Sequence, residues 1–390
     1  MAASGSAAVR DAPSQKGLGY LKNQIIDENL ELEIAELEKL YEKKLWHQLT
    51  LKLQSVTQNP FFQSEQRLVD LYKNFTYDFE TKINPLALVQ MLSFVAKQIP
   101  SSEEAIQFLE KNEAKVKAHS EAVLLLKVLR GQILLHKNGD LVATKTLLED
   151  SEKALNDLEG VTDVHGRFYK LYSDFYRIKA NHAEYYRSAL RYLGCINLDT
   201  LGDEEKVQQA CYLGLAALLG EGVYNFGELL AHPILEALRK TSNKWIVDLL
   251  FVFNSGSLKQ FEELRSSWSQ QPDLVANELF LRQKICLLAL MEMTFRRPAN
   301  NRQLLFQEIC QETSLPLEEV ELLVMKALSL NLVKGYIDQV EQKVYMTWVQ
   351  PRVLDKKQVS VMINRLDTWC RDIQAMEMLV EKKAHDILTF

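Results

Sequence analysis

Between Asn29 and about Gln271, apolar residues recur at helical spacing in one segment after another, and the few prolines and glycines lie between the segments. Residues three and four positions apart lie on one face of an α-helix, so each segment predicts an amphipathic helix. In Glu121–Lys137, for example, the stripe consists of Val123, Leu126, Leu129, Ile133 and His136. No part of this region shows a convincing strand pattern. The region is therefore predicted to be entirely α-helical.

Short polar turns divide this region into pairs of helices. They lie at Asn138–Asp140, Ala180–His182 and Asn254–Ser257, and the interval before the third leaves room for one more turn near Tyr224. The resulting period of about 40 residues is typical of solenoids in which each helix pair packs on the next. Residues 29–271 are therefore predicted to form a helical-repeat solenoid. Residues 1–28 are rich in Ala, Ser and Gly and are predicted to be a flexible tail.

The pattern changes after Pro272, and residues 272–354 predict a second module. Helical segments are expected at 273–294 and 303–311, followed by a helix that ends near Asn331. The buried stripe of that last helix consists of Val320, Leu323, Val324, Ala327 and Leu328. Residues 334–337 and 343–348 then read as two strands around a polar turn, with Val344, Met346 and Trp348 on one face. Two helices followed by a β-hairpin are the order of a winged helix.

The strand in this hairpin also suggests a contact site. Val344–Val349 carries no formal charge, and an unpaired edge strand of this kind can accept a neighbouring strand. Tyr345 and Thr347 are therefore expected to take part in a protein interface if they face an open sheet edge.

Residues 355–390 contain no Gly or Pro and predict one long C-terminal helix. Apolar residues repeat along it at intervals of three and four, with Lys383 as the one exception, as in the seam of a coiled coil. These seam residues are Val359, Met362, Leu366, Trp369, Ile373, Met376, Val380 and Ile387. At about 1.5 Å per residue the helix would extend about 50 Å, longer than a winged helix can cover. A helical partner from another chain is expected, the alternative being a helix that folds back over its own domain.

Composition narrows the class of protein. The chain has 390 residues, of which 47% are hydrophobic and 25% charged, with a net charge of −6, which is ordinary for a soluble protein of two or three domains. No apolar run approaches the roughly 20 residues of a membrane-spanning helix. Five scattered cysteines indicate reduced thiols rather than a disulfide framework. No membrane association is expected, and a secretory signal is not indicated.

No arrangement of residues predicts an active site, a metal site or a cofactor site. The closest histidines, His165 and His182, are too far apart in sequence for a zinc-ligand pair. The glycines around Gly220–Gly222 follow a predicted helix and lack the Gly-Lys-Ser/Thr step of a phosphate loop. The chain is therefore predicted to be no enzyme and to need no cofactor.

Nucleic-acid binding is also disfavoured. Aromatic and basic residues are interleaved over 165–192, but Phe168, Tyr172 and Phe175 share one helical face, which indicates core packing. RNA contact through this stretch would require the rings to be exposed. The second helix of the winged-helix motif carries Glu318, Glu319 and Glu321 against Lys326, which opposes contact with phosphates of duplex DNA.

A solenoid that leads into a winged helix and a C-terminal helix resembles the PCI family, named for the proteasome lid, the signalosome and a translation initiation factor. Longer strings resemble subunits of the proteasome lid in particular. They are LYEKKLWHQLTLKL (40–53), GLAALLGEGVYNFGELLAHPILEAL (214–238), LMEMTFRRPANNRQLLFQEI (290–309), VELLVMKALSLNLVKG (320–335), VYMTWVQPRVL (344–354) and MEMLVEKKAHDIL (376–388).

The resemblance implies a non-catalytic scaffold in a hetero-oligomer located in the cytoplasm and nucleus. In that family, winged helices line up edge to edge, and C-terminal helices gather in one bundle. The partners implied are other lid subunits, including the deubiquitinase pair, whose metalloprotease motif begins with two His separated by one residue. No such pair occurs here. The alternative is a scaffold of a signalosome, translation-initiation or RNA-export complex with RNA contacts.

Overall fold

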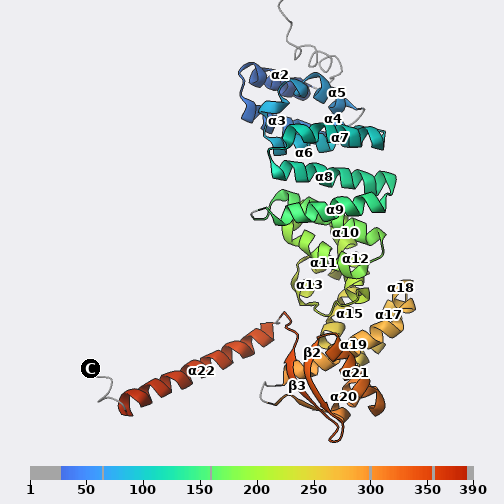
Figure 1. Cartoon of the computed structure of the whole chain (residues 1–390), viewed down its shortest axis with the longest axis vertical. Coiled ribbons are helices and arrows are strands. Elements are labelled where there is room, and N and C mark those ends of the chain that lie inside the picture. The colour runs from blue at the N-terminus through green and yellow to red at the C-terminus, as the bar shows by residue number, and fades with distance from the viewer. Residues whose placement is uncertain (1–27, 64–65, 159, 298–300, 354–355, 384–390) are drawn as a thin grey trace, which may run out of the picture. The chain divides into compact units, whose positions relative to one another are not determined.

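The computed structural model describes residues 28–63, 66–158, 160–297, 301–353 and 356–383 (Figure 1). Most of the predicted N-terminal tail, residues 1–27, and the predicted seam residue Ile387 lie outside the described residues. The described chain consists of helices with one small sheet, which confirms the predicted class of a helical solenoid, a winged-helix module and a C-terminal helix. It forms two compact units, residues 1–180 with 191–196, and residues 181–190 with 197–390.

The first unit is a stack of helices in which successive helices pack side by side (Figure 1). Its helices are α2 (Glu28–Glu42), α3 (Trp46–Gln58), α4 (Pro60–Gln63), α5 (Arg67–Asn74), α6 (Pro85–Gln98), α7 (Ser102–Val116), α8 (Ser120–Ile133), α9 (Leu141–Asn156) and α10 (Asp163–Ile178). Helix α11 (His182–Cys195) is shared between the two units. One continuous apolar core runs through this unit from Ile34 to Phe175, as expected when each helix pair buries its apolar face on the next.

The predicted turns are confirmed. At Asn138–Asp140, Gly139 adopts a φ of 67°, and the Asp140 carboxylate caps α9 by accepting hydrogen bonds from two backbone N–H groups, each at 3.0 Å. At Asn254–Ser257, Gly256 adopts a φ of 69°. A Cβ atom there would lie 2.6 Å from the backbone of Ala289, so both the φ angle and the close approach require glycine.

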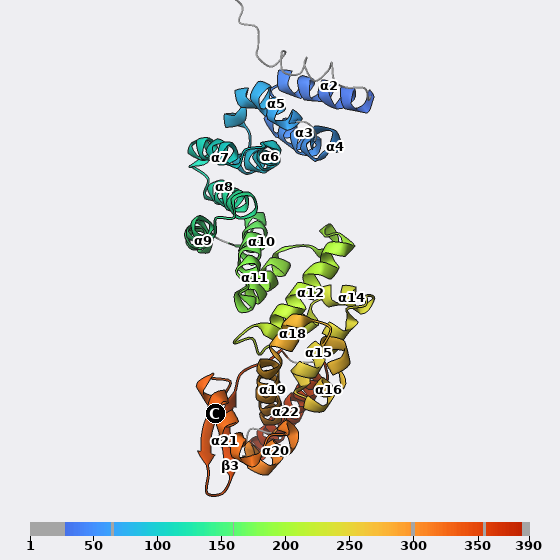
Figure 2. The same cartoon turned by 90° about the vertical axis from the view of Figure 1, so that its right-hand side faces the viewer.

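The second unit begins with helical repeats and continues into the winged helix. Its remaining helices are α12 (Asp203–Leu219), α13 (Gly227–Ala231), α14 (Ile234–Arg239), α15 (Lys244–Ser255), α16 (Leu258–Glu263), α17 (Arg265–Trp268), α18 (Pro272–Ala276), α19 (Glu278–Arg296), α20 (Phe306–Thr313), α21 (Leu317–Ser329) and α22 (Lys356–Lys383). The helix expected over 273–294 is divided at Asn277 into α18 and α19. Figure 2 shows α19, α20 and α21 gathered beside strand β3, where they form the helical part of the winged helix.

The sheet has three strands rather than the predicted two. They are β1 (Gln303–Leu305), β2 (Val333–Asp338) and β3 (Lys343–Val349), in the order β1-β3-β2 and antiparallel throughout. The prediction that 303–311 is helical from its first residue was wrong. Only three residues form β1, with Leu304 fully buried between exposed neighbours, and so short an alternation cannot be distinguished from helical spacing in sequence.

The prediction that Trp348 shares a face of the hairpin with Val344 and Met346 was also wrong. Val344 and Met346 are buried together, but Trp348 is 37% exposed. The pairing of β2 with β3 shifts by one residue between Lys334 and Gly335, and such an irregularity reverses the side-chain alternation beyond it. Val349 therefore takes the buried position that periodicity assigned to Trp348.

Candidate protein-interaction surfaces

Helix α22 presents its apolar seam to solvent. No described side chain from Val359 to Lys383 is buried. The exposed fractions of the seven seam residues that the structure describes run from 42% at Val359 to 68% at Met376. Soluble proteins seldom leave a long apolar stripe exposed, because its burial is favourable. The packing that the fold-back alternative needs is thus missing from the described part of α22.

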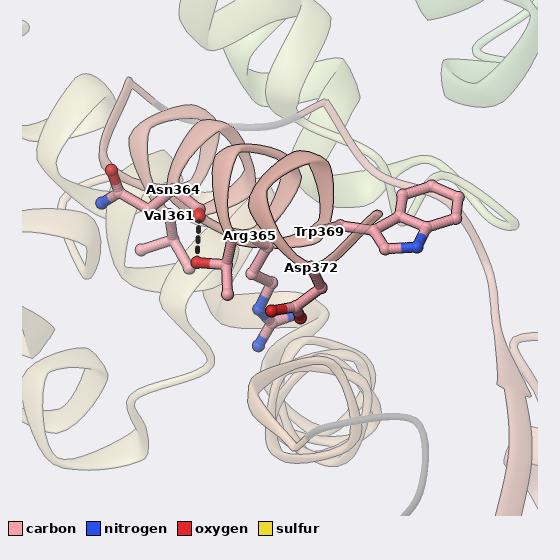
Figure 3. Close-up of a pocket in the computed structure, with 6 residues that line it drawn as sticks. Val361, Asn364, Arg365, Trp369 and Asp372 are labelled. Atoms are coloured by element: carbon pink, nitrogen blue, oxygen red, sulfur yellow. Dashed lines mark hydrogen bonds between the residues drawn. The ribbon is translucent and has the colours of Figure 1, made fainter. Parts of the chain in front are cut away.

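A shallow open groove runs beside this seam (Figure 3). All six lining residues belong to α22 itself, namely Val361, Asn364, Arg365, Thr368, Trp369 and Asp372. The indole of Trp369 projects outward from the helix, and the hydroxyl of Thr368 donates a hydrogen bond to the Asn364 carbonyl at 2.9 Å. A groove formed by a single helix has no opposite wall. It is suited to a second helix packing alongside rather than to enclosing a small molecule.

Tyr345 does not face an open sheet edge, so the condition set for its role in pairing with a neighbouring strand is not met. Strand β3 is central, and Tyr345 pairs with Gln303 on one side and with Tyr336 on the other. The N–H group of Met346 donates to the Arg302 carbonyl at 2.9 Å, so β1 occupies the edge that the two-stranded hairpin would have left open. Since β1 is so short, sequence reasoning missed it.

The exposed face of the sheet carries Tyr345 beside aromatic neighbours. Tyr336 and Tyr345 stack with ring centroids 4.7 Å apart, and the Lys334 ammonium lies 5.0 Å from the centroid of the Trp348 ring. The Thr347 hydroxyl donates to the Lys334 carbonyl at 3.1 Å. Strand β2 is the other edge of the sheet. Tyr345 and Thr347 therefore lie on the central strand, one strand inside either edge of the sheet.

The aromatic stretch over 165–192 faces the core. Phe168, Phe175, Tyr185, Tyr186 and Tyr192 are all buried. Tyr169, Tyr172 and Tyr176 are partly buried against the same apolar core. The exposure on which the RNA alternative depends is therefore not found in this stretch.

The outward side of α21 is acidic and apolar. Glu318 and Glu319 are exposed in its first turn, and Leu322 and Met325 are exposed farther along. The ammonium of Lys326 donates to the Gln283 side chain at 2.7 Å. Such a surface does not attract phosphates, whereas contact with another protein would match its character.

The described residues contain no group of three His, Cys, Asp or Glu side chains placed to hold a metal ion. Burial raises the pKa of Cys286 to about 11, which keeps this thiol protonated and poorly nucleophilic. The loop at Gly220–Gly222 follows helix α12, as expected for a turn between helices rather than a phosphate loop. Within the described part of the chain, none of the helices is long and apolar enough to cross a membrane.

Comparison with known proteins connects these surfaces with a family. Residues 33–250 match the family described as PSD13 N-terminal repeats, and residues 258–348 match the PCI domain. The chain is 39% identical over 384 residues to 26S proteasome non-ATPase regulatory subunit 13 homolog B of Arabidopsis thaliana, covering 95% of this chain and 99% of the relative.

Two further relatives differ in how much of this chain they match. The 26S proteasome non-ATPase regulatory subunit 13 of Dictyostelium discoideum is 38% identical over 383 residues, covering 96% of this chain and 99% of the relative. Subunit M of eukaryotic translation initiation factor 3 from Neosartorya fischeri is 26% identical over 165 residues, covering 41% of this chain and 35% of the relative. The two matches to regulatory subunit 13 cover nearly the whole chain, whereas the match to the initiation-factor subunit covers less than half of it. The chain therefore belongs to the family of 26S proteasome non-ATPase regulatory subunit 13.

Proposed function

We propose that this chain is a non-catalytic scaffold subunit of the proteasome regulatory-particle lid and supports ubiquitin-dependent protein degradation by holding other lid subunits together. In this proposal, residues 29–271 form the repeat arm, residues 272–354 the winged-helix docking module, and residues 355–390 the helix for a shared bundle. Its partners are PCI subunits beside the winged helix and helices of other lid subunits, including the deubiquitinase pair. The assembly operates in the cytoplasm and nucleus.

The observation that carries the proposal is the exposed seam of α22. Seven apolar side chains at intervals of three and four lie on one helix and are open to solvent. Because each is about half exposed, covering it would contribute roughly half of the 1.5–3 kcal/mol of full burial, or about 1 kcal/mol, less the cost of ordering the side chains. A bundle of helices satisfies such a seam, and a small-molecule substrate does not. Relatives named as regulatory subunits of the 26S proteasome support the lid as the assembly concerned.

A second candidate is a scaffold of a translation-initiation complex. The partial similarity to an initiation-factor subunit supports it. However, that similarity covers less than half of the chain, and the aromatic stretch that would have supplied RNA contacts faces the core. The lid is therefore the better supported assembly.

Co-purification tests the proposal. We expect the tagged full-length chain to recover lid subunits in comparable amounts from a cell lysate, as identified by mass spectrometry. A chain truncated after Leu354 should remain soluble and helical by circular dichroism and lose most of the lid subunits. Recovery of initiation factors or RNA in place of lid subunits would refute the lid proposal and favour the second candidate.

A further inference from the structure

Lys284 on α19 is a fully buried cation held by backbone carbonyls. Its side chain is 1% exposed, and its ammonium donates to three of them, those of Ala217 at 2.8 Å, Leu218 at 3.0 Å and Gly220 at 2.8 Å. A lysine ammonium has three donors and no acceptor, so the three carbonyls match its full capacity. The side chain is thus held in one specific position rather than merely enclosed.

The three carbonyls lie at the C-terminal end of α12. The last carbonyls of a helix have no partner within the helix, and the helix dipole places partial negative charge there. The rings of Tyr224, Phe226 and Phe280 surround the ammonium with centroids 5.4 to 5.8 Å away, a separation at which ring faces attract a cation. Lys284 therefore caps α12 from a different helix, in a site closed by aromatic rings.

A second cation with a buried side chain, Arg352, caps helix α15 in a similar way. Arg352 follows β3, and its guanidinium donates to the Asn254 carbonyl at the end of α15 at 3.2 Å. It also donates to the Leu288 carbonyl at 3.2 Å and the Glu292 carboxylate at 3.1 Å, both on α19. Helix α12 and the part of α15 up to residue 250 lie in the match to the N-terminal repeats, whereas Lys284 lies in the match to the PCI domain. Asn254 and Arg352 lie outside both matches. The hydrogen bonds of Lys284 thus cross the division between the two matched parts.

We propose that Lys284 and Arg352 form a two-cation clamp that joins repeat helices α12 and α15 to the winged-helix module, so that these helices and the module open and close as one cooperative unit. A buried carbonyl left without a donor is costly, so neither side can separate without exposing or stranding these groups. The clamp goes beyond the proposed function, because it concerns how the free chain is held together. The compact unit formed by residues 181–190 and 197–390 includes both sides of the clamp.

Hydrogen exchange on the full-length free chain tests the clamp. At pH 6, where Lys284 with its pKa of about 7 is mostly charged, Lys284→Met is expected to accelerate amide exchange by about tenfold in the last turn of α12 and in 220–226. The acceleration should extend to α19, while α6–α8 in the first unit remain unchanged. Lys259→Met is the matched control, because Lys259 is an exposed lysine on α16 in the same unit. Arg352→Met should accelerate exchange at the end of α15 in the same manner.

The unaltered chain supplies a second test that does not depend on whether the variants fold. With increasing sub-denaturing urea, the slowest amides of α12, α15 and α19 should converge on one opening free energy, as members of one cooperative unit do. Opening of α12 well before α19 in the unaltered chain would refute the clamp. So would a Lys284→Met exchange pattern equal to that of Lys259→Met. Neither outcome depends on assembly with lid subunits, so failure of the clamp and failure of the scaffold proposal are distinguishable.

Discussion

At the scale of single residues, the most informative side chains are ionisable groups that lie in apolar, buried surroundings. Desolvation lowers the pKa of Lys284 from 10.5 to about 7, since burial disfavours the charged form. Cys286, on the same helix, is also buried, and its pKa rises for the same reason. Both residues lie in an apolar helical pattern, so sequence periodicity alone reads them as ordinary core positions.

Lys284 predicts a pH dependence of stability. Because its pKa is about 7 in the folded chain and 10.5 in the unfolded chain, the unfolded chain binds more protons between these values. The cost of burying the charge is complete below pH 7 and disappears as the pH rises toward 10.5. The free energy of unfolding of the unaltered chain minus that of Lys284→Met should therefore rise with pH, by up to about 1.4 kcal/mol per unit. Urea titrations at pH 7, 8 and 9 measure it, and a constant difference would contradict the assignment.

The different exposure of the cysteines predicts the order in which a thiol reagent modifies them. Cys370 is exposed on α22 beside the seam residue Trp369, whereas Cys286 is buried. In the free chain, a maleimide should modify Cys370 first and Cys286 last, as followed by mass spectrometry. In a preparation assembled with lid subunits, Cys370 should react at least about tenfold more slowly if the seam is covered. Equal Cys370 rates in the free and assembled chain would show that α22 remains uncovered.

At the scale of elements, the central place of β3 changes what a proline substitution tests. Tyr345 pairs on both sides, so Tyr345→Pro should disrupt the sheet at a cost of about 1–3 kcal/mol for each group left without a partner. Ile337 on edge strand β2 lies opposite Val344. Because the Met346 N–H group points to the β1 side and alternate residues of a strand point the same way, Val344 and Ile337 form a non-hydrogen-bonded pair, and the Ile337 N–H group faces away from β3.

Ile337→Pro should therefore destabilise the folded sheet less than Tyr345→Pro does. It should nevertheless weaken strand pairing with a neighbouring lid subunit. Thermal unfolding and native-gel assembly separate the two effects. Ile337→Ala controls for the lost side chain. Assembly of a folded Ile337→Pro chain at the level of Ile337→Ala would rule out pairing through the β2 edge.

The negative charge on α21 predicts that the winged helix does not recognise duplex DNA. Its exposed side carries Glu318 and Glu319, and these carboxylates repel phosphates rather than release counterions. A filter-binding titration with mixed duplex DNA at physiological salt should show only weak, non-specific binding. Tight and sequence-dependent binding would overturn this interpretation of the winged helix.

At the scale of the whole molecule, much of the architecture could be predicted from sequence because long segments repeat one period. The helical solenoid, the turns at Asn138–Asp140 and Asn254–Ser257, and helix α21 follow directly from spacing and turn residues. Strand β1 could not be predicted, because three residues carry no period, and its partner β3 lies about 40 residues away. Trp348 was misplaced because register shifts depend on pairing rather than on the strand's own sequence.

The candidate surfaces likewise divide into those that a local sequence pattern predicts and those that depend on residues far apart in the chain. The seam of α22 is a local pattern within one helix, so its residues could be identified from the order of amino acids alone. The clamp depends on Lys284 meeting carbonyls 64 to 67 positions away in the chain, which no local pattern encodes. The position of Tyr345 likewise depends on a strand that the chain supplies from elsewhere.

Assembly of the α22 seam variant tests the scaffold account most directly. Ile373→Asp/Met376→Asp adds two charges to the seam, and an unpaired charge is costly to bury. Gln374→Asp/Met378→Asp adds the same two charges away from it, with Met378 on nearly the opposite side of the helix, and is the matched control. Both chains should fold equally by circular dichroism. On native gels with the other lid subunits, the seam variant should fail to assemble while the control assembles normally. Normal assembly of the folded seam variant would show that the seam is no docking surface and would contradict the account.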